Sequence, residues 1–156
     1  MVKHLLEEIK QSKPFERPGD EAMLSIVRTA SMLEHATNEL LRPFGLTTTQ
    51  YNVLRILRGA GAAGLCGKEI GERMVSRVPD VSRLLDRMEG MGLIGKERDA
   101  SDRRHITARL TAKGRRTLED ATTPELVDFG RNRMARLSAR TIEALNEALA
   151  VIRETP

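Results

Sequence analysis

The sequence has almost no aromatic residues. Among its 156 residues there are no Trp, one Tyr and three Phe. A core built from this chain must therefore consist mainly of Leu, Ile, Val, Met and Ala, which suits packed helices better than sheets. The length allows one domain with a substantial core, or one domain with helical extensions that need a partner.

Long apolar runs are also missing, and cysteine is nearly absent. No segment approaches the ~18 uninterrupted apolar residues of a membrane span. The first ten residues carry charges where a signal peptide needs its apolar stretch. The single Cys66 has no partner for an intrachain disulfide, which fits a reducing compartment. We therefore expect a soluble, cytoplasmic protein that makes no membrane contact.

Patterns for metal or cofactor chemistry are weak. The three His residues are scattered without the spacing of a metal site. Gly59, Gly61 and Gly64 have the G-x-G-x-x-G spacing of a dinucleotide-binding loop, but such a loop follows a strand and opens a helix. Here a helical pattern precedes the glycines, and a helix C-cap followed by a loop explains them better. We expect no enzyme, metal or cofactor; the alternative is an enzyme that binds a nucleotide cofactor through residues 59–64.

Positive charge is concentrated in one stretch. The net charge of +4 and the pI near 9.6 are weak evidence of an anionic partner by themselves. Residues 96–116, however, contain eight positive and three negative residues. Their net charge of +5 leaves the rest of the chain at −1. Any polyanion that binds this protein is therefore expected to meet this stretch.

Three helices are predicted in the first half of the chain. Apolar residues at helical spacing predict a long helix that has Asp20 as its N-cap and ends before Pro43. Thr47 and Gln50 have the spacing of a capping box for a second helix, which continues to Gly59. A third, short helix is predicted from about residue 66 to residue 74.

A fourth helix is predicted to begin near Pro79, because proline is favoured at the first helical position. Its apolar residues recur at positions i, i+3, i+4 and i+7, which gives one buried stripe. They are Val81, Leu84, Leu85 and Met88. Asp80, Arg83 and Arg87 fall on the solvent-facing side. Arg83 and Arg87 form either a salt-bridged surface with Asp80 and Asp86 or a surface that contacts a partner.

Two short strand patterns follow, LIGKER and HITARL, and flank a charged turn from Asp99 to Arg103. Hairpin turns are usually polar, but the adjacent Arg103 and Arg104 in an already basic region require a nearby anion. Three helices followed by such a hairpin are typical of a winged helix-turn-helix. In that motif one helix enters the DNA major groove, while the hairpin, or wing, contacts the backbone or the minor groove.

The predicted fold is therefore mainly α (α+β), with three parts. N-terminal helices (1–46) precede a winged helix-turn-helix with a two-stranded wing (47–112), and C-terminal helices follow (113–156). Ser138 is a candidate cap of the last helix, whose apolar residues repeat at 3-4-3 spacing: Ile142, Leu145, Leu149 and Ile152. We expect the terminal helices to form a dimerisation layer, because their apolar surface exceeds what the central module can cover. Packing onto their own domain is the alternative.

The residues expected to contact DNA lie before the fourth helix, on it and at the wing tip: Arg77, Asp80, Ser82, Arg83, Arg87, Arg103 and Arg104. Arginine binds both phosphates and guanine edges. DNA repels Asp102 unless that acid has a cationic partner, so we expect Asp102 to form an ion pair that organises the wing. The alternative is a winged helix that binds proteins instead of DNA.

The segment VSRVPDVSRLLDRMEGMGLIGKERDASDRRHITARLTAKG (residues 75–114) closely resembles the recognition helix and wing of MarR-family transcriptional regulators. The triplet Asp102-Arg103-Arg104, followed by a strand and by Leu110-Thr111-x-x-Gly114, matches the wing signature of that family. The likeness extends over most of the chain: a long first helix, the winged helix-turn-helix and two C-terminal helices. The sequence differs from many relatives at Pro79-Asp80, where those have small hydroxyl residues.

The resemblance implies a homodimer with interlocked terminal helices that binds a pseudo-palindromic operator in double-stranded DNA and represses transcription. It also implies that Arg104 enters the minor groove and that Asp102 pairs with an arginine of the recognition helix or wing. Asp80, Ser82 and Arg83 then face the major groove, where Asp80 either accepts from a cytosine or caps the helix. Many relatives release DNA on binding a small aromatic anion between the dimer helices and the DNA-binding lobe. An aromatic or phenolic effector is therefore expected, without an assignment of its pocket.

Overall fold

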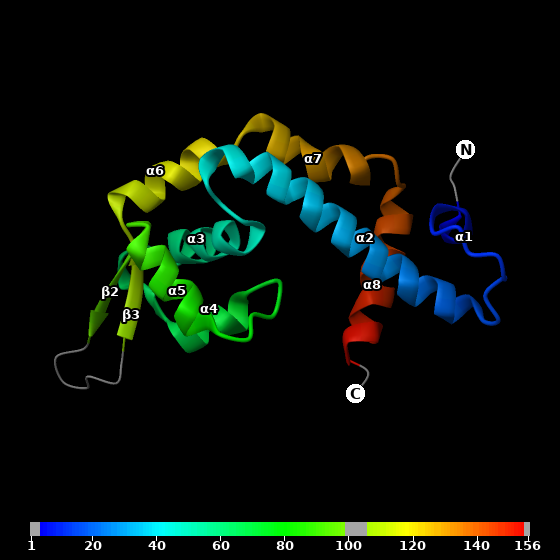
Figure 1. The fold of residues 1–156 in the computed structure, drawn as a ribbon, viewed down its shortest axis with the longest axis horizontal. Coiled ribbons are helices and arrows are strands. Elements are labelled where there is room, and N and C mark those ends of the chain that lie inside the picture. Colours follow the sequence, from blue (N-terminus) through cyan, green and yellow to red (C-terminus); the bar gives the residue numbers. More distant parts are fainter. Residues whose placement is uncertain (1–3, 99–105, 155–156) are drawn as a thin grey trace. The chain divides into compact units, whose positions relative to one another are not determined.

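The computed structural model describes residues 4–98 and 106–154 (Figure 1). The chain divides into two compact units, residues 1–48 and residues 49–156. Asp102, Arg103 and Arg104 lie outside the described residues. The three-part division predicted above remains a prediction, because it assigns the terminal segments by their role in a dimer.

The first unit consists of a short helix, a long helix and a 3-10 turn: α1 (Leu5–Glu8), α2 (Pro18–Leu41) and η1 (Arg42–Phe44). The prediction of Asp20 as the N-cap of the long helix was wrong. Arg17 occupies the cap, Pro18 takes the first helical position, and Asp20 lies in the first turn, 3.2 Å from the Arg17 guanidinium. Proline suits this position because its missing N–H would have no intrahelical partner there. The helix ends near Pro43, as predicted.

The second unit begins with the winged helix-turn-helix. Its elements are α3 (Thr48–Ala60), η2 (Gly61–Ala63), β1 (Leu65–Cys66), α4 (Gly67–Arg73), α5 (Val81–Gly90), β2 (Ile94–Arg98) and β3 (Ile106–Leu110). The strands form one antiparallel sheet in the order β1-β3-β2, in which Ile94 pairs with Leu110 and Leu65 with Ala108. The mainly helical fold and the two wing strands are as predicted. The strand β1 was not predicted.

The core of this unit is aliphatic, as the scarcity of aromatic residues predicts. Helix α5 buries Leu84, Leu85 and Met88, three of the four residues of its expected stripe. The other buried side chains come from α3, β1, α4, the wing strands, the residue before β2, and α6: Val53, Leu54, Leu57, Leu65, Ile70, Leu93, Ile94, Ala108, Leu118 and Ala121. Helix and wing therefore rest on one shared core.

The glycine-rich segment is a connector between a helix and a strand. Gly59 lies inside α3, which continues to Ala60, so the prediction of a glycine C-cap was wrong in detail. Gly64 has a φ of +67°, and a Cβ added to it would lie 2.5 Å from the Ala108 carbonyl oxygen. Only glycine fits this close approach to β3. The segment leads into a strand instead of opening a helix, so it lacks the architecture of a dinucleotide-binding loop.

Three helices follow the wing, where the resemblance implied two: α6 (Ala112–Ala121), α7 (Pro124–Met134) and α8 (Ala139–Glu154). Thr123 caps α7 by accepting from the N–H of Leu126 at 3.2 Å. Ser138 caps α8, as predicted, by accepting from the N–H of Thr141 at 3.1 Å. Within residues 4–98 and 106–154, no helix is long and apolar enough to cross a membrane.

Candidate nucleic-acid interface

Asp80 fixes the start of α5 and holds the first arginine of that helix. Its Oδ1 atom accepts from the backbone N–H of Arg83 at 2.9 Å, and its Oδ2 atom lies 3.4 Å from Arg83 Nε. Pro79 therefore precedes the cap. The prediction that Pro79 is the first helical residue was wrong. Of the two roles considered for Asp80, helix capping is the one observed. Carboxylates are favourable at this end because the helix dipole is positive there.

The outer face of α5 is exposed and carries the expected polar residues. Ser82, Arg83 and Arg87 are exposed on the side opposite the buried stripe. The salt-bridged alternative holds for Arg83, which pairs with Asp80, whereas Asp86 pairs with Lys96 of β2. In the described part of the chain, Arg87 has no ion pair. Arg77 is also exposed, in the turn before the helix.

Three cations of the basic stretch are engaged within the protein, which the charge count missed. Lys96 bonds to Asp86 and Glu89. Arg109 donates to the Ala62 carbonyl at 2.7 Å and pairs with Glu97, and Lys113 donates to the Met91 carbonyl at 2.7 Å. The exposed cations that remain in the described part of this stretch are Arg98, Arg115 and Arg116.

The base of the wing is fastened to α6 by Thr111. Its hydroxyl donates to the Gly92 carbonyl at 2.6 Å and accepts from the N–H of Gly114 at 2.9 Å. The first residue of β2 and the last residue of β3 are therefore both next to this anchored point. The predicted contacts of Arg103 and Arg104 and the ion pair of Asp102 stay predictions, because these residues lie beyond the described ranges.

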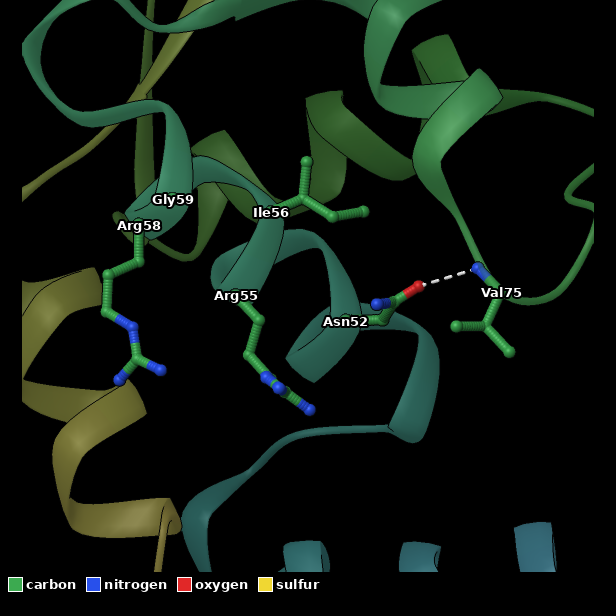
Figure 2. Close-up of a pocket in the computed structure, with 6 residues that line it drawn as sticks. All are labelled: Asn52, Arg55, Ile56, Arg58, Gly59 and Val75. Carbon is green, nitrogen blue, oxygen red and sulfur yellow. Dashed lines mark hydrogen bonds between the residues drawn. The ribbon is translucent and has the colours of Figure 1, made fainter. Parts of the chain in front are cut away.

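An open cavity of about 480 Å³ lies along α3 (Figure 2). Its lining consists of Asn52, Arg55, Ile56, Arg58, Gly59 and Val75. Arg55 and Arg58 are exposed, and the Arg55 guanidinium lies 5.9 Å from the centre of the Tyr51 ring. Asn52 Oδ1 accepts from the N–H of Val75 at 3.0 Å, which ties the cavity to the turn before α5. Cations beside apolar side chains suit a small anion with an apolar body.

Metal chemistry has no support in the described residues, where no group of three or more His, Cys, Asp or Glu side chains is arranged to hold an ion. Cys66 caps the short helix α4 in a capping box with Glu69, whose carboxylate accepts from the Cys66 N–H at 2.9 Å.

Comparison with known proteins gives a consistent result. The model of the MarR family matches residues 46–106. An uncharacterised HTH-type transcriptional regulator of Bacillus cereus is 31% identical over 108 residues, which cover 69% of this chain and 70% of that protein. The HTH-type regulator YwoH of Bacillus subtilis is 32% identical over 95 residues, 61% of this chain and 67% of that protein.

Solved structures extend the similarity to the whole fold. The MarR-family regulator Sco5413 of Streptomyces coelicolor has a TM-score of 0.70 and 28% identity, covering 87% of this chain and 93% of that one. The transcriptional repressor CouR, bound to a 23-mer DNA duplex, has a TM-score of 0.70 and 27% identity, covering 99% of each chain.

Proposed function

Since the chain belongs to the MarR family of transcription regulators and is not an enzyme, we propose that it is a homodimeric repressor that binds a pseudo-palindromic operator. The observation that carries this proposal is the exposed face of α5, with Arg83 and Arg87, on the same core as the wing strands. A helix and a wing on one body are suited to meet a groove and the backbone beside it. We place the protein in the cytoplasm, with the DNA that it binds.

The repressor role is supported by similarity to CouR, a repressor with a DNA-bound structure that aligns over nearly the whole chain. The dimer is supported by apolar side chains left exposed near both ends of the chain. On α2 they are Met23, Leu24, Val27 and Met32, and on the predicted seam of α8 they are Leu145 and Ile152. Exposed apolar residues in such numbers indicate an association surface. We propose that residues 1–46 and 113–156 supply it and that residues 47–112 bind DNA.

Within the DNA-binding part, we propose that Ser82, Arg83 and Arg87 face the major groove and that Arg77 meets the backbone. Asp80 acts through Arg83, because its carboxylate already accepts from the Arg83 N–H and pairs with the guanidinium. It therefore aims the arginine instead of binding a cytosine itself. Arg103 and Arg104 are assigned to the wing contact and Asp102 to its organising ion pair, on the basis of the sequence.

Arg104→Ala should weaken binding to an operator duplex by about 1–3 kcal/mol, because it removes a cation from the proposed minor-groove contact. The measurement is equilibrium binding over a salt series, with a duplex that the wild-type protein selects from random sequences. Wild-type affinity should fall steeply as salt rises, since cations that meet phosphates release counterions.

Arg136→Ala is the matched control, because Arg136 is exposed in the turn before α8. It should bind like the wild-type protein. Equal affinity of Arg104→Ala and wild type would refute the wing assignment. If the winged helix binds only proteins, neither the wild-type protein nor either variant should show salt-dependent affinity for duplex DNA.

We further propose that the cavity along α3 binds a small aromatic anion that releases the operator. Arg55 and Arg58 supply the positive charge, and Ile56 and Val75 supply apolar surface. The hydrogen bond from Val75 to Asn52 connects this cavity to the turn that leads into α5. A ligand that displaces Val75 therefore changes the start of the helix proposed to read DNA.

Arg55→Ala/Arg58→Ala should weaken binding of an aromatic carboxylate by about 100-fold or more, because charge-assisted hydrogen bonds to the carboxylate contribute about 1.5–3 kcal/mol each. Calorimetry with hydroxybenzoates measures this affinity, and release of a labelled operator measures the response. Arg136→Ala again serves as the control. Unchanged affinity in the double variant would place the ligand elsewhere, and no binding by the wild-type protein would exclude this effector class.

A further inference from the structure

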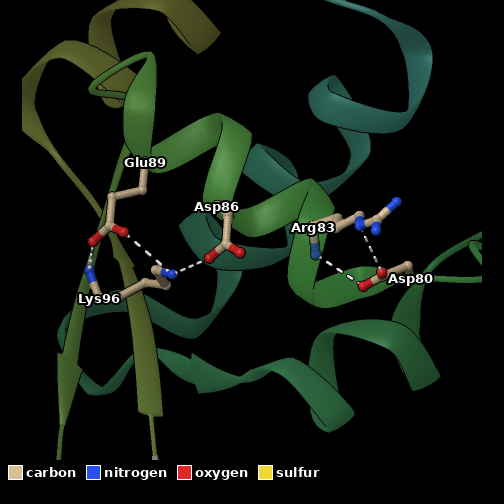
Figure 3. A network of polar contacts seen from close by, with 5 residues as sticks. All are labelled: Asp80, Arg83, Asp86, Glu89 and Lys96. Atoms are coloured by element: carbon tan, nitrogen blue, oxygen red, sulfur yellow. Dashed lines mark hydrogen bonds and ion pairs between the residues drawn. The ribbon is translucent and has the colours of Figure 1, made fainter.

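Lys96 of β2 holds two carboxylates of α5 (Figure 3). Its ammonium group bonds to Asp86 Oδ1 and lies 3.2 Å from Glu89 Oε2. The backbone N–H of Lys96 also donates to Glu89 Oε1 at 3.2 Å. The Lys96 side chain is only 20% exposed, although that of Asp86 is 64% exposed. One strand residue thus bridges to the helix through three contacts.

The two carboxylates attach the helix at separate points. They are three residues apart, which corresponds to about 4.5 Å along the helix axis and about 60° around it. The buried side chains of α5 already pack into the core shared with the wing, and two polar attachments restrain the rotation of the helix and its sliding along β2 further than one would. The segment between α5 and β2 includes Gly92, with a φ of +73°. Backbone hydrogen bonds fix this connection, because the Gly92 N–H donates to the Glu89 carbonyl at 2.8 Å and the Leu93 N–H donates to the Met88 carbonyl at 3.0 Å. The side-chain bridge adds a restraint earlier in the helix, at Asp86.

Asp86 lies beside the arginines proposed to meet DNA. On an α-helix, about 60° separates it from Arg83 and about 100° separates it from Arg87. All three side chains are exposed. An acid at this place repels phosphates unless a cation accompanies it. Lys96 is that cation.

The charge of Lys96 is secure, because the hydrogen bond to Asp86 raises its pKa above the ordinary value of 10.5. Burial acts in the opposite direction, and Glu89 adds to the increase. The ammonium group is therefore protonated at any pH near neutrality. It remains engaged by the two carboxylates and is not available for a phosphate.

We infer that Lys96 is a positioning residue for sequence-specific DNA binding, which locks α5 to the wing strand β2 through Asp86 and Glu89. This inference rests on the proposed function. Lys96 does not touch DNA. Specific recognition requires base edges and backbone to be met at the same time. A helix that shifts against the wing therefore loses specific contacts but keeps the general attraction to DNA.

Asp86→Ala/Glu89→Ala tests the inference, because it removes both attachments while raising the net charge by two. Affinity is measured at one salt concentration for two duplexes, one selected by the wild-type protein from random sequences and one of mixed sequence without that site. The ratio of the two affinities should fall about tenfold, which is comparable to the effect of one mismatched base pair. Electrostatics alone predicts tighter binding to both duplexes. Lys96→Met should lower the ratio in the same direction.

Glu119→Ala/Asp120→Ala is the matched control, since it removes two exposed acids of α6 and changes the charge equally. Its ratio should equal that of the wild-type protein. Thermal unfolding is measured for every variant, and all affinities are then measured at one temperature well below the lowest unfolding transition. If Lys96→Met does not fold, the Asp86→Ala/Glu89→Ala variant alone tests the inference. An unchanged ratio in Asp86→Ala/Glu89→Ala overturns the inference, as does an equal fall in the control. A wild-type protein that selects no sequence instead refutes the proposed function.

Discussion

Gly114→Ala should lower the free energy of unfolding by about 3 kcal/mol or more, because it forces a methyl group into occupied space. A Cβ added to Gly114 would lie 1.9 Å from the carbonyl oxygen of Leu93 and 2.9 Å from its carbonyl carbon. Gly114 is buried, so the new group has no route to solvent. Either α6 moves away from the end of α5 and β2, or this part of the fold opens.

The neighbouring backbone has little freedom to yield. The Leu93 carbonyl accepts from the Thr111 N–H at 3.2 Å and from the Thr111 hydroxyl at 3.1 Å. The same hydroxyl accepts from the N–H of Gly114, which makes it the N-cap of α6. Moving Leu93 or α6 therefore breaks hydrogen bonds as well as packing. This arrangement gives a physical reason for the spacing Thr111-x-x-Gly114 after the wing.

Urea denaturation followed by circular dichroism measures the loss. Gly130→Ala is the matched control, because Gly130 lies inside α7 and has nothing within 4 Å of an added Cβ. That variant should gain up to about 1 kcal/mol, since alanine favours helices more than glycine does. A Gly114→Ala protein that unfolds at the wild-type urea concentration would contradict the close packing of α6 on Leu93.

The order of helices and the hairpin was readable from the sequence because each rests on local periodicity. Leu84, Leu85 and Met88 mark the buried side of α5 by spacing alone, and the structure buries all three. Helix starts were less certain. Asp20 was predicted as an N-cap but lies in the first turn of α2, and Pro79 was predicted as the first helical residue but precedes the N-cap of α5. Both errors arise because acids and proline are favoured at several positions around a helix start.

Contacts between distant residues were not readable in this way. The two-residue strand β1 is too short for a periodic pattern and forms only because β3 lies beside it. The count of positive residues treated Lys96 and Arg109 as available for DNA. Their partners come from α5, β2 and η2. Only the fold brings those partners within reach, so composition overstates the charge that faces outward.

Leu145→Glu/Ile152→Glu should convert the proposed dimer into monomers. Both side chains lie on the predicted seam of α8 and are 39% and 42% exposed. Burying a carboxylate without a partner in an apolar interface costs several kcal/mol. The variant places two such groups in each protomer, so this cost applies to each of them. Sedimentation equilibrium should then give the mass of one chain, 17.4 kDa. The secondary structure should persist, because neither side chain belongs to the buried core of one chain.

The same variant should bind the selected operator duplex about 100-fold more weakly or worse. In a dimer, the second half-site binds within an already formed complex, and monomers lose this effective concentration. Affinity for a duplex that carries one half-site should change far less. This comparison separates loss of the dimer from damage to the DNA-binding surface.

Ala144→Glu/Val151→Glu provides the control, because it adds the same charge to exposed positions of α8. On an α-helix these two positions lie about 80° or more from the seam residues, so the control protein should remain dimeric and bind the operator normally. If instead the seam variant stays dimeric and the control falls apart, the opposite side of α8 forms the interface. If neither changes, α8 packs within its own protomer, and the association surface must be sought on the exposed apolar residues of α2.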